Sequence, residues 1–263
     1  MRRFLALISI SLIFCSCTSS KHRVSTITYF ENDYKDIVMQ IAYMPDGKVA
    51  HIDLDSGQNR YDFYYETPNR ITISEDNKNT YFAIVNELGF VTSIYDRPDN
   101  SRDKLEITYL YDNKYLSDIQ YTIGQDKSYD YRFLWKDGNL QQCKFRYQIF
   151  NNTGKNDIWE RIVNISYSYE KSRNSQNFVF FHAFTGIDSR WEAITTVLQS
   201  AGLLGLQNKN LVREIKSEAI ESDRKPIMDY TIITNVLNND GTIQKQYLNN
   251  NDNEVIKYNY SSR

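Results

Sequence analysis

The sequence repeats one short unit, in which two runs of alternating apolar residues flank a tight turn. In one such run, Leu105, Ile107 and Tyr109 fall on one face, while Glu106 and Thr108 fall on the other. A period of two residues is the pattern of an antiparallel strand that is buried on one face only. The next run alternates in the same way after a turn at residues 112–114, so the two runs predict a β-hairpin.

Hairpin units recur along the whole chain. Their turns contain Asp46-Gly47, Pro68-Asn69, Leu88-Gly89, Asn113-Lys114, Asp137-Gly138 and Asp240-Gly241. Glycine after Asp supplies the positive φ that tight hairpin turns require. The chain has 21 Tyr and 13 Phe but only 10 Gly and 4 Pro, which also favours strands. We therefore expect an all-β, antiparallel meander in a single domain.

One segment has helical spacing instead. Its apolar residues recur every three or four positions, at Trp191, Ile194, Val197, Leu198 and Ala201. Ser189 and Glu192 fit a capping box, and Gly202 stands where a helix ends. We expect one helical insert over about residues 189–201, which packs on the sheet or closes one end of it.

The N-terminus has the layout of a bacterial lipoprotein signal. Arg2 and Arg3 precede a mostly apolar run over residues 4–14, which is too short to span a bilayer, and a Cys-Ser-Cys follows it. Cys17 is the expected lipid anchor because the small Ser16 precedes it; Cys15 and a plain secretory signal are the alternatives. The expected organisation is a signal peptide over 1–16, a lipidated tether over 17–30 and one domain over 31–263.

The remaining composition restricts the partners. Cleavage before Cys17 and its acylation leave Cys143 as the one free thiol, so no intramolecular disulfide is expected. The chain carries 31 basic and 33 acidic side chains, for a net charge of -2, which argues against nucleic acid as a partner.

The serial strand–turn–strand units, the helical insert with residues 203–211 (LLGLQNKNL) after it, and the closing hairpin at Asp240-Gly241 resemble the DUF4595 family. The resemblance covers roughly residues 36–260. It implies a lipoprotein of Bacteroidota with a porin-like, barrel-type fold and no established activity. The meander is thus expected to close into a barrel or a strongly curved sheet. The family also implies attachment to the outer membrane on its periplasmic side.

A spanning barrel and a tethered, water-soluble barrel are both compatible with this pattern. Spanning barrels usually end in an aromatic residue, whereas this chain ends after Tyr260 in Ser261, Ser262 and Arg263. A lipid anchor would also be redundant on a spanning barrel. We expect the tethered form.

Catalytic and metal-binding patterns are weak. No HExxH, CxxC, GxSxG or P-loop motif is present. His182 lies in an apolar run, where a packed histidine is expected rather than a general base. The oxygen-rich stretch over residues 249–254 lacks the spacing of a calcium loop. We expect that the protein is not an enzyme and that it binds no metal and no cofactor.

Two function classes remain. Trp135, Trp159 and Trp191 are candidates for stacking on a small apolar or glycan ligand, which would make the protein a non-catalytic binding module. Aromatic cross-strand packing explains the same residues. The alternative is a structural or assembly protein that acts through protein–protein contacts at the outer membrane. The sequence does not give the ligand or the oligomeric state.

Overall fold

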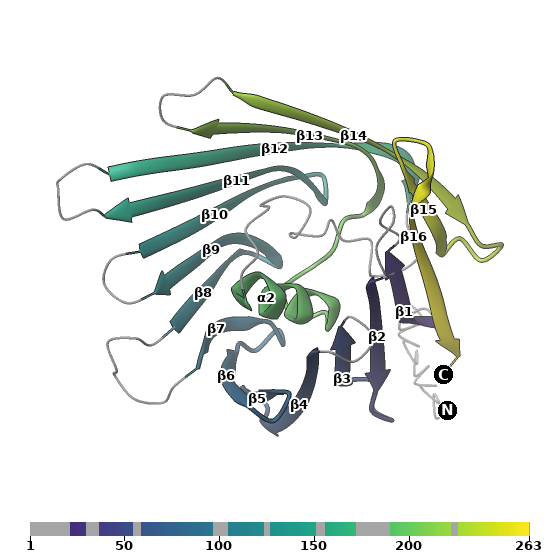
Figure 1. The fold of residues 1–263 in the computed structure, drawn as a ribbon. Coiled ribbons are helices and arrows are strands. Elements are labelled where there is room, and N and C mark those ends of the chain that lie inside the picture. The colour runs from purple at the N-terminus through teal and green to yellow at the C-terminus, as the bar shows by residue number, and fades with distance from the viewer. Residues whose placement is uncertain are drawn as a thin grey trace, which may run out of the picture.

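The chain forms a closed antiparallel β-barrel. The computed structural model describes residues 22–29, 37–54, 59–96, 105–123, 127–150, 156–171, 190–221 and 226–262. Within these residues each strand pairs with its neighbours in sequence, and the first strand pairs with the last (Figure 1). The predicted antiparallel meander is confirmed, and it closes into a barrel rather than remaining a curved sheet.

The strands follow in chain order around the barrel. They are β1 (His22–Tyr29), β2 (Ile37–Tyr43), β3 (Val49–Leu54), β4 (Asn59–Thr67), β5 (Arg70–Glu75), β6 (Asn79–Val85), β7 (Val91–Tyr95), β8 (Leu105–Asp112), β9 (Tyr115–Ile123), β10 (Lys127–Lys136), β11 (Asn139–Phe150), β12 (Asn156–Lys171), β13 (Asn210–Glu221), β14 (Ile227–Leu237), β15 (Ile243–Leu248) and β16 (Asn251–Ser262). The helix is α2 (Arg190–Ser200), between β12 and β13.

One turn geometry recurs between strands. The β2–β3, β6–β7 and β14–β15 turns each contain a five-residue loop. The backbone N–H of the first loop residue donates to the carbonyl of the fifth, and the carbonyl of the first accepts from the N–H of the fourth, which is a glycine. In the β14–β15 turn these residues are Asn238, Thr242 and Gly241. A strand register shift lies beside each of these turns. This is the pattern of a hairpin whose glycine has positive φ and forms a bulge. The β10–β11 turn has positive φ at both Asp137 and Gly138, as a two-residue hairpin turn requires.

The strands bury one face and expose the other. In β5, Ile71 and Ile73 are buried, whereas Arg70 and Thr72 between them are only partly covered. The buried residues of β1–β13, β15 and β16 join the residues of helix α2 in one hydrophobic cluster. The interior of the barrel is therefore mainly apolar, whereas the outer wall is more polar.

The two ends of the barrel differ. The "helix end" carries the β2–β3, β4–β5, β6–β7, β8–β9, β10–β11 and β14–β15 turns and the link that holds α2. Strand β1 also starts there, and β16 ends there, since β1 and β16 are antiparallel. The "opposite end" carries the β5–β6 and β15–β16 turns.

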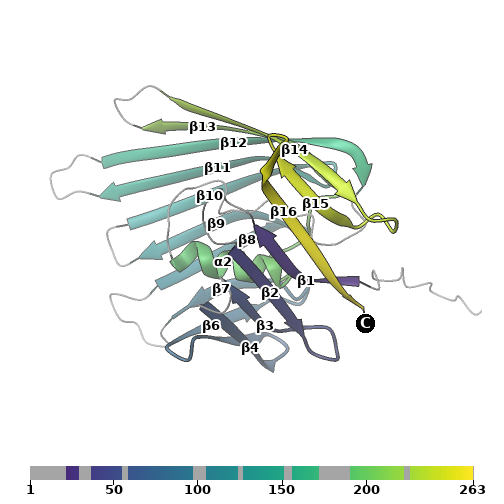
Figure 2. The ribbon, with the colours of Figure 1, turned by 45° about the vertical axis from the view of Figure 1, so that its right-hand side comes forward.

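Helix α2 lies inside the barrel (Figures 1 and 2). Ile194, Val197 and Leu198 are fully buried, and Thr195, Gln199 and Ser200 are buried as well. The Thr195 hydroxyl lies 3.1 Å from the Tyr109 hydroxyl and 2.8 Å from the Tyr121 hydroxyl, both on the inner wall. The predicted helix is confirmed, and it packs on the inner face of the sheet.

The helix ends in a Schellman motif. The Leu203 N–H donates to the Leu198 carbonyl at 3.0 Å, and the Gly202 N–H donates to the Gln199 carbonyl at 2.9 Å. Gly202 has a φ of +74°, which a glycine adopts without strain. Gly202 thus stops the helix where the sequence predicted.

The chain after the helix crosses three turns of the helix end. The Leu203 carbonyl accepts from Val91, Leu206 donates to the Lys114 carbonyl, and Lys209 donates to the Gly138 carbonyl. These bonds tie residues 203–209 to the β6–β7, β8–β9 and β10–β11 turns. They fix the depth at which α2 sits in the barrel.

The barrel begins before the boundary expected from the sequence. Strand β1 lies inside residues 17–30, the segment expected to be a tether, and pairs with both β2 and β16. Val24 and Ile27 of this strand are fully buried. The first strand is needed to close the barrel, so the folded part starts no later than His22.

Candidate functional site

The three candidate tryptophans do not form one platform. Trp135 lies on β10 beside the β10–β11 turn; its Nε1–H donates to the Leu116 carbonyl at 2.7 Å, and its ring packs on Tyr115. Trp159 lies on β12 toward the opposite end. Trp191 is on α2, but its side chain lies outside the described residues, as does Cys17. The tight hydrogen bond of Trp135 fits a structural role, which leaves Trp159 as the candidate among the tryptophans whose side chains are described.

Trp159 ends a chain of aromatic contacts on the inner wall. Tyr121, which contacts the helix, lies 5.7 Å from Tyr131 between ring centroids. Tyr131 lies 4.7 Å from Phe145, and Phe145 meets the edge of Trp159 at 5.2 Å. Aromatic rings therefore line the wall continuously from α2 to Trp159.

The strand register places an arginine in the same wall. Residues directly opposite in antiparallel strands point to the same face. The register aligns one inner row from Tyr131 through Phe145, Arg161 and Ala219 to Ile227. Arg161 is flanked along β12 by Trp159 and by the buried Val163. Its guanidinium thus faces the interior.

Exposure rises along this row away from the helix. Tyr131 and Phe145 are 3% and 2% exposed. The Arg161 side chain is 15% exposed, and Ile227 is 56% exposed although it stands on the inner row. The inner wall is therefore covered near α2 and accessible at β13 and β14.

The Arg161 guanidinium is incompletely paired. Its Nη2 donates to the Ser217 hydroxyl at 3.1 Å and lies 3.4 Å from Asp229 Oδ2, whose carboxylate is 63% exposed. Its Nε is buried and has no hydrogen-bond partner. A buried donor without a partner costs free energy unless another group satisfies it. We call Phe145, Trp159, Arg161, Ser217 and Ile227 the inner arginine face.

A buried carboxylate elsewhere in the interior is fully hydrogen-bonded. Buried Glu75 accepts hydrogen bonds from the Tyr61 hydroxyl at 2.8 Å, the Tyr81 hydroxyl at 2.7 Å and the Asn79 side-chain amide at 2.9 Å. Burial, followed by the nearby Glu75 charge, raises the pKa of Tyr61 well above its usual range, so this phenol stays protonated and donates. These groups hold one another and belong to the core.

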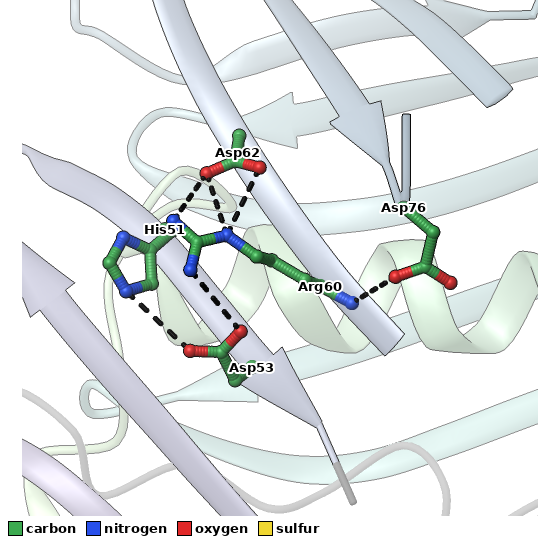
Figure 3. Close-up of polar contacts among 5 residues, drawn as sticks. All are labelled: His51, Asp53, Arg60, Asp62 and Asp76. Carbon is green, nitrogen blue, oxygen red and sulfur yellow. Dashed lines mark hydrogen bonds and ion pairs between the residues drawn. The ribbon is translucent and has the colours of Figure 1, made fainter. Parts of the chain in front are cut away.

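A second charged cluster lies on the outer wall (Figure 3). It consists of His51 and Asp53 on β3 and of Arg60 and Asp62 on β4. These residues alternate with the buried Ile52 and Tyr61, and the register pairs His51 with Asp62 and Asp53 with Arg60. Arg60 binds Asp62 through Nε at 3.0 Å and Nη2 at 2.9 Å. The hydrogen bonds to Asp62 raise the pKa of Arg60 above its usual value.

This outer cluster ties three strands together. The His51 Nε2 lies 3.5 Å from Asp53 Oδ2, and Arg60 Nη1 lies 3.9 Å from Asp53 Oδ1. The Arg60 backbone N–H also donates to Asp76 Oδ1 at 2.8 Å, at the end of β5 (Figure 3). The Arg60–Asp53 contact joins side chains of neighbouring strands, so the arrangement fits cross-strand ion pairing.

Nucleophilic and metal chemistry find little support in the described part of the chain. Cys143 is buried on the inner face of β11, and burial raises the pKa of its thiol far above the usual range, so the thiolate is suppressed. Among the described residues, no group of three His, Cys, Asp or Glu side chains is placed to hold a metal ion. His182 and residues 188–189 lie outside the described residues.

Sequence reasoning missed Arg161, although the pattern that reveals it was present. Trp159, Arg161, Val163 and Ile165 stand at every second position, so alternation alone puts the arginine on the apolar face. A charged residue on the buried face of a strand is uncommon without a partner. Ser217 and Asp229 are not near Arg161 in sequence, and only the strand register brings them together.

Comparison with known proteins supports the fold. A crystal structure of a porin-like protein from Bacteroides uniformis superimposes with a TM-score of 0.63, covering 90% of this chain and 98% of that chain at 12% identity. The fold is porin-like. No protein-family model matches the sequence, and no curated protein matches it. The porin-like fold expected from the resemblance is thus confirmed, whereas membership in DUF4595 stays a prediction.

In the described ranges, no helix is long and apolar enough to cross a bilayer.

Proposed function

We propose that this protein is a lipid-anchored, water-soluble porin-like barrel at the periplasmic side of the outer membrane, and that it binds a small ligand at the inner arginine face without turnover. The observation that supports the proposal is the polarity of the barrel, which is the reverse of that in a membrane-spanning barrel. Its interior is apolar and holds a helix, while its outer wall carries ion pairs.

The outer wall is unsuited to lipid contact. Lys144 in the middle of β11 pairs with Glu160 at 2.8 Å, and Lys216 in the middle of β13 pairs with Glu214 at 2.8 Å. Both pairs lie on the outer face, because Cys143, Phe145 and Ser217 beside them point inward. A membrane barrel carries an outward apolar band at this height. A tether, rather than insertion, is then the means of membrane attachment.

The anchor would orient the barrel. Four residues separate Cys17 from His22, and β1 starts at the helix end. An extended chain spans about 3.5 Å per residue, so the helix end would lie within about 20 Å of the bilayer surface. The opposite end, where Trp159 and Arg161 lie, would face away from the membrane, where a soluble ligand has access.

Ligand binding is supported by the chemistry of the inner arginine face. Aromatic rings that alternate with a few convergent polar groups are typical of small-molecule sites. Here the ring of Trp159 adjoins Phe145, and the guanidinium of Arg161 has an unfilled donor. Ile227 adds exposed apolar surface on the same face.

The test is a binding screen on the protein lacking residues 1–20. Glycans and apolar molecules are screened by thermal shift and by tryptophan fluorescence. We expect a hit whose fluorescence change is lost in Trp159→Phe and kept in Trp135→Phe. Hydrolysis of a hit, or binding that Trp159→Ala leaves unchanged, would overturn the proposed site and its lack of turnover.

The anchor is tested separately. Cys17→Ala should abolish labelling by a palmitate analogue and move the protein out of the membrane fraction, whereas Cys15→Ala should do neither. Label retained in the Cys17 variant would contradict the anchor assignment.

The alternative function is assembly at the outer membrane through protein contacts. One observation favours it: Ile220, Met228 and Tyr230 are 37%, 66% and 49% exposed on the outer face of the β13–β14 hairpin. Exposed apolar side chains in a group mark protein–protein contacts. Loss of a specific cross-linked partner in Met228→Asp, with ligand screens negative, would favour this function over binding.

A further inference from the structure

We propose that the ligand of the inner arginine face is a single-chain amphiphile with an anionic head group, a carboxylate or a phosphate. This inference rests on the proposed binding function and specifies its ligand. The head group is assigned to Arg161 and the apolar chain to the wall formed by Trp159 and Ile227.

The free edge of the guanidinium selects the head group. Nε–H and one Nη2–H of an arginine lie on the same edge, which binds carboxylates and phosphates through two parallel hydrogen bonds. In Arg161, Nε is buried without a partner and Nη2 contacts Ser217 and Asp229. An anion on this edge would satisfy Nε, and the Ser217 hydroxyl lies beside it to donate a further bond.

Asp229 contacts Arg161 only weakly. Its Oδ2 lies 3.4 Å from Arg161 Nη2, longer than a typical charge-assisted hydrogen bond of about 2.8 Å. Its side chain is 63% exposed, so the carboxylate can turn to water at little cost. Asp229 therefore acts as a replaceable counter-ion, which an incoming anion displaces.

The apolar chain is assigned from the residues around Arg161. Ala219 and Ile227 follow Arg161 on the inner row, and Trp159 precedes it on β12. Ile227 leaves 56% of its surface to water on the inner face. A chain attached to the head group would cover this surface, and covering apolar surface favours binding. A free inorganic anion would bind the Arg161 guanidinium but would leave the apolar surface of Ile227 uncovered.

The experiment compares four probes on the protein lacking residues 1–20. They are decanoate, decyl phosphate, the neutral decyl maltoside, each below its critical micelle concentration, and inorganic phosphate. Binding is followed by calorimetry and by tryptophan fluorescence. We expect both decyl anions to bind more tightly than decyl maltoside, and inorganic phosphate to bind weakly or not at all.

Variants assign the head group. Arg161→Gln should weaken the anionic amphiphiles at least about tenfold, because a charge-assisted hydrogen bond is lost, and leave decyl maltoside unchanged. Asp229→Asn should tighten the anions severalfold by removing the competing carboxylate. Lys144→Gln removes a cation from the outer face of the neighbouring strand and should change nothing. A gain of affinity in Asp229→Asn is a result that misfolding cannot produce.

The outcomes separate this inference from the proposed function. If glycans or decyl maltoside bind at Trp159 while the anions do not, the anionic ligand is wrong and the binding function stands. If the anions bind equally well to Arg161→Gln, the head-group assignment is wrong. If no probe and no molecule of the wider screen binds, both proposals fall.

Discussion

At the scale of single residues, glycine conformation is where sequence reasoning was most reliable. Gly138 and Gly241 were predicted to have positive φ after Asp, and their φ values are +82° and +84°. Asp-Gly identifies such a turn because a residue with a Cβ is strained there. Asn113 also has a positive φ, of 56°, at the position that Asp137 takes in the β10–β11 turn.

Gly205 is the glycine we expect to be least replaceable. A Cβ on Gly205 would lie 2.8 Å from the Lys114 carbonyl oxygen, which also accepts the Leu206 N–H at 2.8 Å. Gly89 has a similar φ, but nothing lies within 4 Å of its Cβ position. Gly89→Ala should cost about 1 kcal/mol of backbone strain, and Gly205→Ala about 1–3 kcal/mol more, because the carbonyl must move.

Denaturant midpoints of the two variants, with equal m-values, measure this difference. Equal midpoints would mean that residues 203–209 adjust without cost and do not fix the helix.

Arg161 illustrates what single positions do not reveal. Alternation puts it on the inner face, yet no local pattern says that Ser217 and Asp229 lie beside it. These contacts depend on the register of β12 with β13 and of β13 with β14, and β13 follows β12 only after residues 172–209. A hairpin turn fixes the register of the strands that it joins, and no such turn joins β12 to β13.

At the scale of elements, the hairpins, the helix and the antiparallel meander were predictable, while the pairing of the two chain ends was not. Turn chemistry and alternation are local, so they identified six hairpins and the segment of α2. Pairing of β1 with β16 joins the two ends of the chain, and it was missed because residues 17–30 were expected to be a tether. Packing of α2 on the sheet was expected, but its position inside the closed barrel was not, since its buried face extends beyond the apolar stripe to Thr195, Gln199 and Ser200.

Thr195 should be the polar contact that holds α2 in place. Its hydroxyl is shared by Tyr109 and Tyr121, all three buried. Thr195→Val keeps the shape but leaves two phenols without this partner, which should destabilise the fold by about 1–3 kcal/mol. Thr196→Val makes the same change one position along the helix, on a partly exposed residue, and should be nearly neutral.

Thermal unfolding of both variants checks the expectation. If the two melt alike, the helix is held by its apolar contacts alone.

At the scale of the whole molecule, buried tyrosines should set the alkaline limit of stability. Burial raises the pKa of Tyr65 from an ordinary value near 10 to about 12, and it raises the pKa of Tyr109, Tyr111, Tyr167 and Tyr258 further. A group with a raised pKa contributes stability that is complete below its unfolded pKa and is lost as pH rises through its folded pKa. Stability should therefore hold up to about pH 10 and fall progressively toward pH 12 and above.

An alkaline titration followed by tyrosinate absorbance and circular dichroism tests this limit. The buried tyrosines should ionise only as the β-sheet signal is lost. Complete ionisation near pH 10 with the sheet signal intact would contradict their burial.

The charged outer wall should keep the barrel soluble without detergent. A chain that starts at Lys21 retains all of β1 and lacks the anchor, and its outer wall presents the Lys144–Glu160 and Lys216–Glu214 pairs to solvent. It should be soluble without detergent, with a β-rich spectrum, because no lipid-facing apolar band is left to cover. A chain that starts at Glu31 is the control; it lacks β1 and should aggregate, since β2 and β16 lose the strand between them. Precipitation of the longer chain unless detergent is present would show that its outer wall contacts lipid, and would replace the tethered barrel with a spanning one.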